Sequence, residues 1–190
     1  MSWKWGETLE SILIIIGASL FVFFSVNVRP DLLNYLALTP AEVWSQPWQL
    51  ITSVFTHRDL FHIFANMFTL YFFGTSVMQL LGVRRFWIIY LVGGIMGSLF
   101  FVALSSITGT RYVSAIGASG AVFALGGVLA VLRPQMRVVV FPVPVPLPLW
   151  AAILGGFAIL SFLPGIAWQA HLGGLMFGVV AGYFFRQRRY

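Results

Sequence analysis

The chain has 190 residues, of which 59% are hydrophobic and 8% are charged, and this composition is typical of an integral membrane protein. It contains no cysteine, which excludes disulfides, thiol nucleophiles and cysteine-ligated metal ions. The formal net charge is +6, and the basic residues stand mainly between the apolar segments. This placement fits membrane topology, so no nucleic-acid partner is expected.

The apolar segments predict an all-α polytopic bundle, with residues 1–190 forming a single six-span membrane domain. The spans are expected at about 11–27, 60–81, 86–106, 117–132, 147–163 and 168–185. No small-residue cleavage site follows the first span, so we expect it to be retained. The connection between the first two spans contains Trp44 and Trp48, which favours an interfacial structure in the headgroup region.

The connection between the fourth and fifth spans is expected to be an extended, polyproline-like linker. It carries a proline at every second position, namely Pro142, Pro144, Pro146 and Pro148.

The distribution of basic residues predicts the orientation of the chain. Six spans place both termini on one side, together with Lys4, Arg84, Arg85, Arg133, Arg137, Arg186, Arg188 and Arg189. The other side has Arg29, Arg58 and Arg111. Because cytoplasmic loops are rich in Lys and Arg, we expect cytoplasmic termini and a location in a prokaryotic plasma membrane.

The fourth span is too short to cross a bilayer alone. From Gly117 to Leu132 a helix would extend roughly 24 Å, whereas the hydrocarbon core is about 30 Å thick. Its start should therefore lie below the surface, as a short central helix. Ser119 stands in its first turn between Ala118 and Gly120. Taken alone, such small residues more often serve close helix packing than catalysis.

Polar side chains from three spans are predicted to lie at a common depth. Counted from the inner ends of their spans, Ser119 lies at about 21 Å, His171 at about 22 Å and Asn66 at about 24 Å. His62 is one turn beyond Asn66 and shares its helix face. Polar groups within spans are costly and point toward function or a partner, so this convergence predicts a site.

The acidic residues limit the chemistry of that site. They are Glu7, Glu10, Asp31, Glu42 and Asp59, and none lies within a span. A Ser-His-Asp triad needs a buried acid, so the form open to this chain is a dyad in which His171 accepts the proton of Ser119. The helix N-terminus, Asn66 and His62 could donate hydrogen bonds to the resulting oxyanion. For Asn66 taken alone, an interhelical hydrogen bond would be the favoured explanation.

A metal site built from His57, His62 and His171 is a weaker alternative. No carboxylate follows Asp59, and the His57–His62 spacing differs from that of a helical zinc motif. For His57, capping or interface packing is a sufficient explanation. We therefore expect no metal and no cofactor.

From Trp48 to Gly178 the chain resembles the rhomboid intramembrane serine proteases. The motifs that carry the resemblance are His57-x4-His62-x3-Asn66, Gly117-Ala118-Ser119-Gly120 with Phe123 one turn later, and Ala170-His171-Leu172-Gly173-Gly174-Leu175-Met176-Phe177-Gly178. The resemblance implies Ser119 as nucleophile, His171 as base, and His62 and Asn66 in an oxyanion hole. It also implies transmembrane protein substrates within the lipid bilayer.

Further roles follow from the same resemblance. Phe123 would lie beside the base, and Gly174 and Gly178 would let the fourth and sixth spans approach closely. Substrates would arrive sideways from lipid past the fifth span, where Phe157 and Phe162 are candidate gate residues.

Two positions depart from the family pattern. Trp48-Gln49 replaces the usual Trp-Arg pair, and Met78 replaces the Glu four residues before Gly82. Both positions are structural in the family, so the departures put loop rigidity in question more than chemistry.

Two other functions compete with proteolysis. One is a non-catalytic rhomboid-like protein that binds unstable transmembrane helices, and the other is a small transporter. A transporter would usually show an internal repeat or an intramembrane acid, and neither is visible. The sequence leaves the oligomeric state open.

Overall fold

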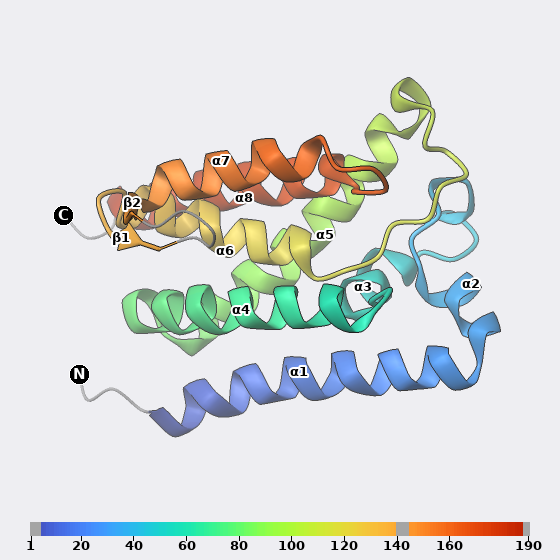
Figure 1. The fold of residues 1–190 in the computed structure, drawn as a ribbon, viewed down its shortest axis with the longest axis horizontal. Coiled ribbons are helices and arrows are strands. Elements are labelled where there is room, and N and C mark those ends of the chain that lie inside the picture. The colour runs from blue at the N-terminus through green and yellow to red at the C-terminus, as the bar shows by residue number, and fades with distance from the viewer. Residues whose placement is uncertain (1–4, 140–144, 188–190) are drawn as a thin grey trace.

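The computed structural model describes residues 5–139 and 145–187, and most of these residues are helical (Figure 1). The α-helices are α1 (Trp5–Val28), α2 (Leu33–Leu36), α3 (Gln49–Phe55), α4 (Leu60–Leu81), α5 (Val83–Thr108), α6 (Ser119–Leu132), α7 (Leu149–Ser161) and α8 (Trp168–Gln187). Short 3-10 helices occur at η1 (Pro30–Leu32) and η2 (Pro40–Glu42). Strands β1 (Arg137–Val138) and β2 (Leu147–Pro148) form one antiparallel pair.

Helices occupy the apolar segments that the sequence indicates, and three of the described helices are long and apolar enough to cross a membrane. These are Gly6–Val28, Leu60–Leu81 and Val83–Thr108. Ser119–Leu132 and Leu149–Ser161 are shorter apolar helices. The start of α1 and the end of α8 lie at the same end of the bundle, and α5 crosses the other long helices obliquely (Figure 1).

The linker before α7 differs in part from the expected polyproline segment. Pro142 and Pro144 lie outside the described residues. Pro148 pairs with Arg137 across the β1–β2 ladder, so the described end of the linker is one side of a short hairpin. Extended backbone is compatible with both forms, and here it is stabilised by pairing with β1.

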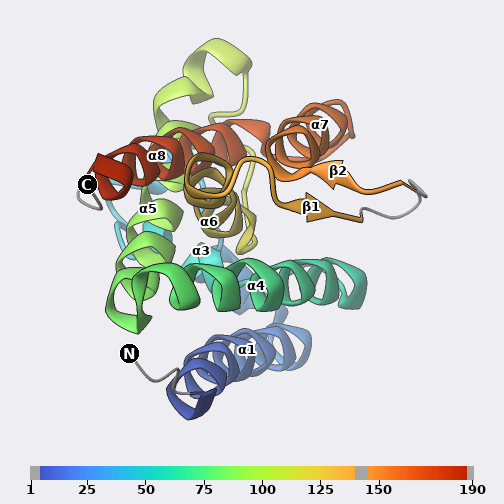
Figure 2. The same ribbon diagram turned by 90° about the vertical axis from the view of Figure 1, so that its left-hand side faces the viewer.

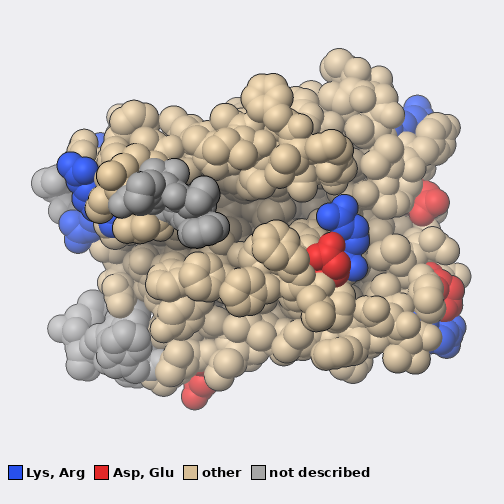
Figure 3. Space-filling model, viewed as in Figure 1, with Lys and Arg blue, Asp and Glu red and all other residues tan. Residues whose placement is uncertain are grey.

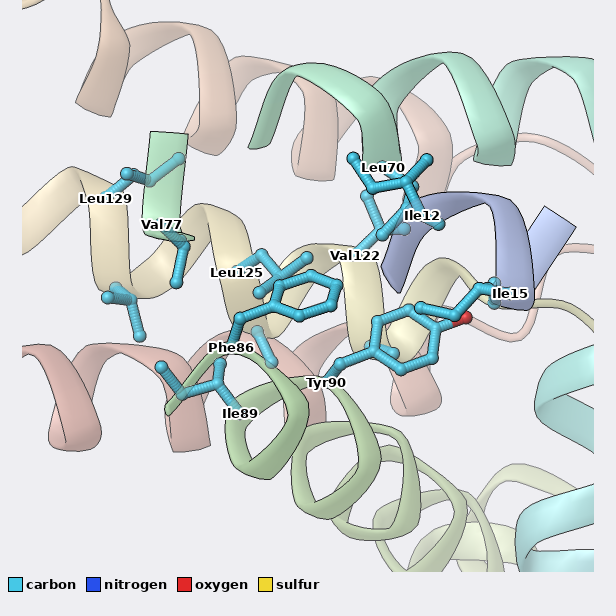
Figure 4. Close-up of a cluster of buried hydrophobic side chains, with 14 of the residues drawn as sticks. Ile12, Ile15, Leu70, Val77, Phe86, Ile89, Tyr90, Val122, Leu125 and Leu129 are labelled. Atoms are coloured by element: carbon cyan, nitrogen blue, oxygen red, sulfur yellow. The ribbon is translucent and has the colours of Figure 1, made fainter. Parts of the chain in front are cut away.

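Helix α6 lies among α4, α5, α7 and α8 (Figure 2). Nearly all of its residues from Gly120 to Leu129 are buried, as expected for a helix that is apolar on every face. A cluster of large side chains joins it to its neighbours, including Phe86 and Tyr90 of α5, Leu70 of α4 and Leu125 of α6 (Figure 4). Because α6 is held on all sides, its first residue has a defined position inside the bundle.

The contact between α6 and α8 depends on glycine. A Cβ atom added at Gly174 would overlap the carbonyl oxygen of Gly120, and one added at Gly178 would overlap that of Ala124. Backbones therefore touch where side chains would normally separate two helices, as the sequence motif predicted.

The connection between α1 and α4 is ordered around Gln49, one of the two departures from the family pattern. Gln49 is fully buried; its side-chain oxygen accepts the N–H of Thr39 at 3.0 Å, and its amide donates to the carbonyl of Asn34 at 3.2 Å. Met78, the other departure, is buried in the apolar core. Trp44 is exposed and Trp48 is half-exposed, as expected for an interfacial segment.

On the face drawn in Figure 3, charged side chains lie toward the two ends, and a broad uncharged surface separates them. Basic side chains are visible toward both ends of this face, at the end where the chain begins and ends and also toward the opposite end, where acidic side chains lie near them (Figure 3). An uncharged middle and charged ends are the distribution required of a surface that contacts lipid.

Candidate active site

Two polar side chains from different helices meet in the interior of the bundle. Ser119 is the first residue of α6, and its Oγ lies 2.7 Å from Nε2 of His171 on α8. His171 is buried, and Ser119 is partly buried. The close approach of α6 and α8 at Gly120 and Gly174 brings the hydroxyl and the imidazole within hydrogen-bonding distance.

The His171 ring is oriented by an aromatic neighbour. The Phe123 ring lies 4.8 Å from it, centroid to centroid, at an interplanar angle of 30°. Nδ1 of His171 is buried and has no hydrogen-bond partner among the described residues. When Nε2 accepts the Ser119 hydroxyl, the neutral imidazole carries its proton on Nδ1. The arrangement is a serine–histidine pair supported by packing.

His62 of α4 lies beside the same hydroxyl. Gly117 has φ of 121°, and a Cβ added to it would lie 2.7 Å from Nε2 of His62 and 3.8 Å from Oγ of Ser119. Nδ1 of His62 accepts the backbone N–H of Arg58 at 3.4 Å. In the neutral ring the proton is therefore on Nε2, the nitrogen that faces Gly117. Gly117 is needed both for its positive φ and for the space above it.

Asn66 lies one turn further along α4 and is buried. Its amide nitrogen donates to the carbonyl of His62 at 2.9 Å, so part of its hydrogen-bonding capacity is used within its own helix. The amide retains a second N–H, since each Asn side chain carries two donors. The structure thus groups Ser119, His171 and His62 closely, and Asn66 is hydrogen-bonded to the backbone of His62 one turn along α4.

The turn that leads into α6 is anchored by backbone contacts. The N–H of Gly117 donates to the carbonyl of Ser53 at 2.9 Å. Leu38 and Ala115 form an antiparallel bridge with two hydrogen bonds of 2.9 Å each. Because Leu38 adjoins Thr39, which Gln49 holds, the ordered connection after α1 also supports the residues before Ser119.

His57 is the site residue whose role the sequence reasoning missed. Its Nε2 accepts the N–H of Ala118 at 3.5 Å, and its Nδ1 lies 3.3 Å from the carbonyl of Phe55. A single neutral tautomer, protonated on Nδ1, satisfies both contacts. Burial lowers the pKa of His57 to about 4, so the ring is neutral near pH 7. Its place in the His57-x4-His62 motif was the signal that pointed to it.

We expect replacement of His57 by Leu to destabilise the turn before α6. The N–H of Ala118 would be left buried without an acceptor, which typically costs about 1–3 kcal/mol. His57→Gln keeps an acceptor close to the position of Nε2 and should cost clearly less. Thermal unfolding of the detergent-solubilised variants measures the difference. Equal loss in both variants would show that the ring contributes by packing alone.

The two candidate gate residues have different surroundings. The Phe157 ring on α7 packs edge-to-face against Phe123 at 6.0 Å, so it contacts the residue that orients His171. Phe162 follows α7 and is 88% exposed. Of the two candidate gate residues, Phe157 is therefore the one that packs against a residue of the site.

Comparison with known proteins identifies relatives. A family model described as a Rhomboid domain matches residues 44–188. Rhomboid protein 1, mitochondrial, of Saccharomyces cerevisiae is 35% identical over 153 residues, which cover 74% of this chain and 44% of the yeast protein. RHOMBOID-like protein 12, mitochondrial, of Arabidopsis thaliana is 33% identical over 196 residues, which cover 94% of this chain and 58% of the Arabidopsis protein. Presenilin-associated rhomboid-like protein, mitochondrial, of Bos taurus is 29% identical over 194 residues, which cover 93% of this chain and 50% of the bovine protein. The chain therefore spans about half the length of these relatives.

These matches correct one expectation. The prediction of a prokaryotic plasma membrane is wrong, because these relatives are eukaryotic proteins whose names describe them as mitochondrial. The charge asymmetry behind that prediction indicates which loops share a side, but it does not identify the membrane. The membrane character itself agrees with the three helices that are long and apolar enough to span.

Proposed function

Because the chain belongs to the rhomboid family, we propose that it is an intramembrane serine endopeptidase that cleaves transmembrane segments of membrane proteins. The observation that carries the proposal is the 2.7 Å contact between Oγ of Ser119 and Nε2 of His171. The proposal includes a single six-span domain in which α6 is the short central helix. The family is a group of intramembrane serine proteases in general, and the pairing of these two side chains supports the same chemistry here.

In the proposed reaction, Oγ of Ser119 attacks a peptide carbonyl while Nε2 of His171 accepts the hydroxyl proton. The tetrahedral intermediate collapses when His171 returns that proton to the leaving amine, and an acyl-enzyme remains on Ser119. A water molecule then attacks the ester, His171 again takes and returns a proton, and the carboxylic acid product leaves. The ring contact with Phe123 keeps His171 in one orientation throughout.

The intermediate carries a negative oxygen, and suitable donors surround Ser119. The first N–H groups of α6 have no intrahelical partner, and they lie at the positive end of the helix dipole. The N–H on Nε2 of His62 faces the same space beside Gly117. Asn66 can contribute its second amide N–H or hold His62 through the carbonyl it already contacts. Such donors stabilise charge that develops only in the transition state.

His62→Ala and Asn66→Ala should each slow turnover without preventing acylation of Ser119. Loss of one preorganised donor typically costs about 10²–10³ in rate, and the effect should be larger for His62, whose Nε2 borders Gly117. The measurement is kcat and KM for a cleaved substrate, together with labelling by a serine-reactive fluorophosphonate. Unchanged turnover in both variants would remove these residues from the proposed oxyanion hole.

The position of Ser119 restricts what can be cut. Ser119 lies about 21 Å from the side of the termini, and hence roughly 9 Å below the opposite edge of a 30 Å core. A stable transmembrane helix keeps its peptide carbonyls hydrogen-bonded, so a substrate must unwind locally to reach the hydroxyl. Gly, Pro or polar residues near that end of the substrate would ease unwinding. From the family resemblance we also expect the substrate to carry a small residue such as Ala just before the cleaved bond.

A reconstituted cleavage assay tests the proposed function. The full chain is placed in liposomes with a single-span substrate, and the products are mapped by mass spectrometry. Replacing the helix-breaking residues of the substrate with Leu should reduce cleavage sharply, and the cut should lie in the third of the span farthest from the termini of the enzyme. Substrate that binds without being cut would instead identify a protein that holds unstable helices. A cut near the side of the termini would contradict the depth of the site.

A further inference from the structure

A groove separates the last turns of α1 from the first turn of α4, at the end of the bundle away from the termini. Its volume is about 680 Å³. The residues that matter for its chemistry are three phenylalanines and three polar side chains: Phe23, Phe24, Phe61, Asn27, Arg58 and Asp59. One part of the groove is thus aromatic, and the other part is polar and charged.

The charged part has both signs. Nε of Arg58 donates to Oδ2 of Asp59 at 3.1 Å, and both side chains are about half exposed or more. The other carboxylate oxygen of Asp59 accepts the N–H of His62 at 2.8 Å. The two Nη groups of Arg58 have no hydrogen-bond acceptor among the described residues, so they can donate to a ligand. The hydrogen bond from His62, followed by Arg58, lowers the pKa of Asp59, which is therefore ionised near neutral pH.

The depth of the groove matches the boundary between lipid tails and headgroups. Helix α4 has 22 residues. At 1.5 Å per residue this is about 33 Å, close to the thickness of a hydrocarbon core of about 30 Å. Asp59 caps the first turn of α4, so Arg58 and Asp59 lie at headgroup level. Phe24 and Phe61, which are 60% and 79% exposed, continue the groove toward the acyl chains.

We propose that this groove binds a phospholipid with a zwitterionic headgroup. The lipid phosphate would contact the guanidinium of Arg58, the ammonium would lie against Asp59, and one acyl chain would run along Phe24 and Phe61. A purely anionic headgroup would leave the Asp59 carboxylate facing like charge. A protein helix packed here would have to desolvate the Arg58–Asp59 pair, which is costly. A lipid headgroup leaves the pair hydrated, and both residues also contact His62, so the groove adjoins the proposed active site.

Photo-crosslinking in nanodiscs tests this site. The probe is phosphatidylethanolamine with a photoactivatable acyl chain, and labelled peptides of the full chain are identified by mass spectrometry. Labelling should concentrate in residues 23–27 and 58–61. Excess phosphatidylethanolamine should compete for it about tenfold better than phosphatidylglycerol, which is the factor expected for one charge-assisted hydrogen bond from the lipid ammonium to Asp59.

Variants separate this site from general lipid contact. Arg58→Ala removes the phosphate partner but leaves the cap made by Asp59, and Phe24→Ala removes part of the aromatic wall. The matched controls are Arg111→Ala and Phe21→Ala, which change exposed residues outside the groove. Labelling should fall in the first pair only, with unchanged thermal unfolding. Equal loss in the controls, labelling spread over all lipid-facing helices, equal competition by the anionic lipid, or no labelling in these peptides would each overturn the proposal.

Discussion

Ser119→Ala and His171→Ala should each reduce cleavage of a single-span substrate by at least about 10⁴-fold. In the first variant no nucleophile remains, and in the second nothing accepts the hydroxyl proton at 2.7 Å. Both changes remove atoms from the α6–α8 contact without adding any, so the protein should still fold. The measurement is turnover of the reconstituted enzyme, accompanied by fluorophosphonate labelling, which should be lost in both variants.

The double variant distinguishes a dyad from two independent residues. In the proposed mechanism Ser119 and His171 act as one unit, so Ser119→Ala combined with His171→Ala should be little worse than either single change. Ser106→Ala is the matched control, since Ser106 is an exposed serine on α5 and should keep full activity. Substantial cleavage by Ser119→Ala would refute the serine-peptidase mechanism.

Much of the fold was predictable because membrane helices are long continuous stretches of apolar residues. The residues at which each helix begins and ends were less predictable. Helix α5 begins at Val83, three residues before the expected start, because Arg84 and Arg85 lie inside the helix. A prediction from hydropathy places the end of a span at the first charged residue. Long basic side chains near a helix end can nevertheless extend to the interface while their backbone stays helical. The guanidinium of Arg85 lies 5.4 Å from the ring of Phe185, which helps to place it there.

The site was predictable to the extent that it is made of side chains with recognisable chemistry. The matched depths of Ser119 and His171 correspond to a direct contact in the structure. The supports of the turn before α6 were not foreseen, because a carbonyl of Ser53 or an N–H of Ala118 has no signature in the sequence. The effect of the Gln49 departure on the loop could not be read from the sequence for a related reason. A buried amide can satisfy several backbone groups at once, but only the fold shows which ones.

Gly174→Ala should disrupt the protein more than any other single-methyl change considered. The added Cβ would overlap the carbonyl oxygen of Gly120, a backbone atom that cannot move unless α6 and α8 separate. Overpacking of this kind typically costs about 1–3 kcal/mol, and we expect the upper end of that range here. Separation also draws His171 away from Ser119, and a displacement of about 1 Å can reduce the rate roughly 10²-fold. Thermal unfolding and kcat measure the two effects.

Three other glycines, in which an added Cβ would meet progressively less crowding, provide a comparison for the same experiment. Gly178→Ala meets the carbonyl of Ala124 one turn further from the site, so it should lower stability similarly but affect kcat less. At Gly182 the nearest atom to an added Cβ is 3.0 Å away, and the loss should be smaller. Gly155→Ala on α7 meets nothing within 4 Å, so it should be neutral or slightly stabilising, since alanine is the better helix former. If Gly155→Ala were as damaging as Gly174→Ala, helix flexibility and not close packing would explain why glycine occupies these positions.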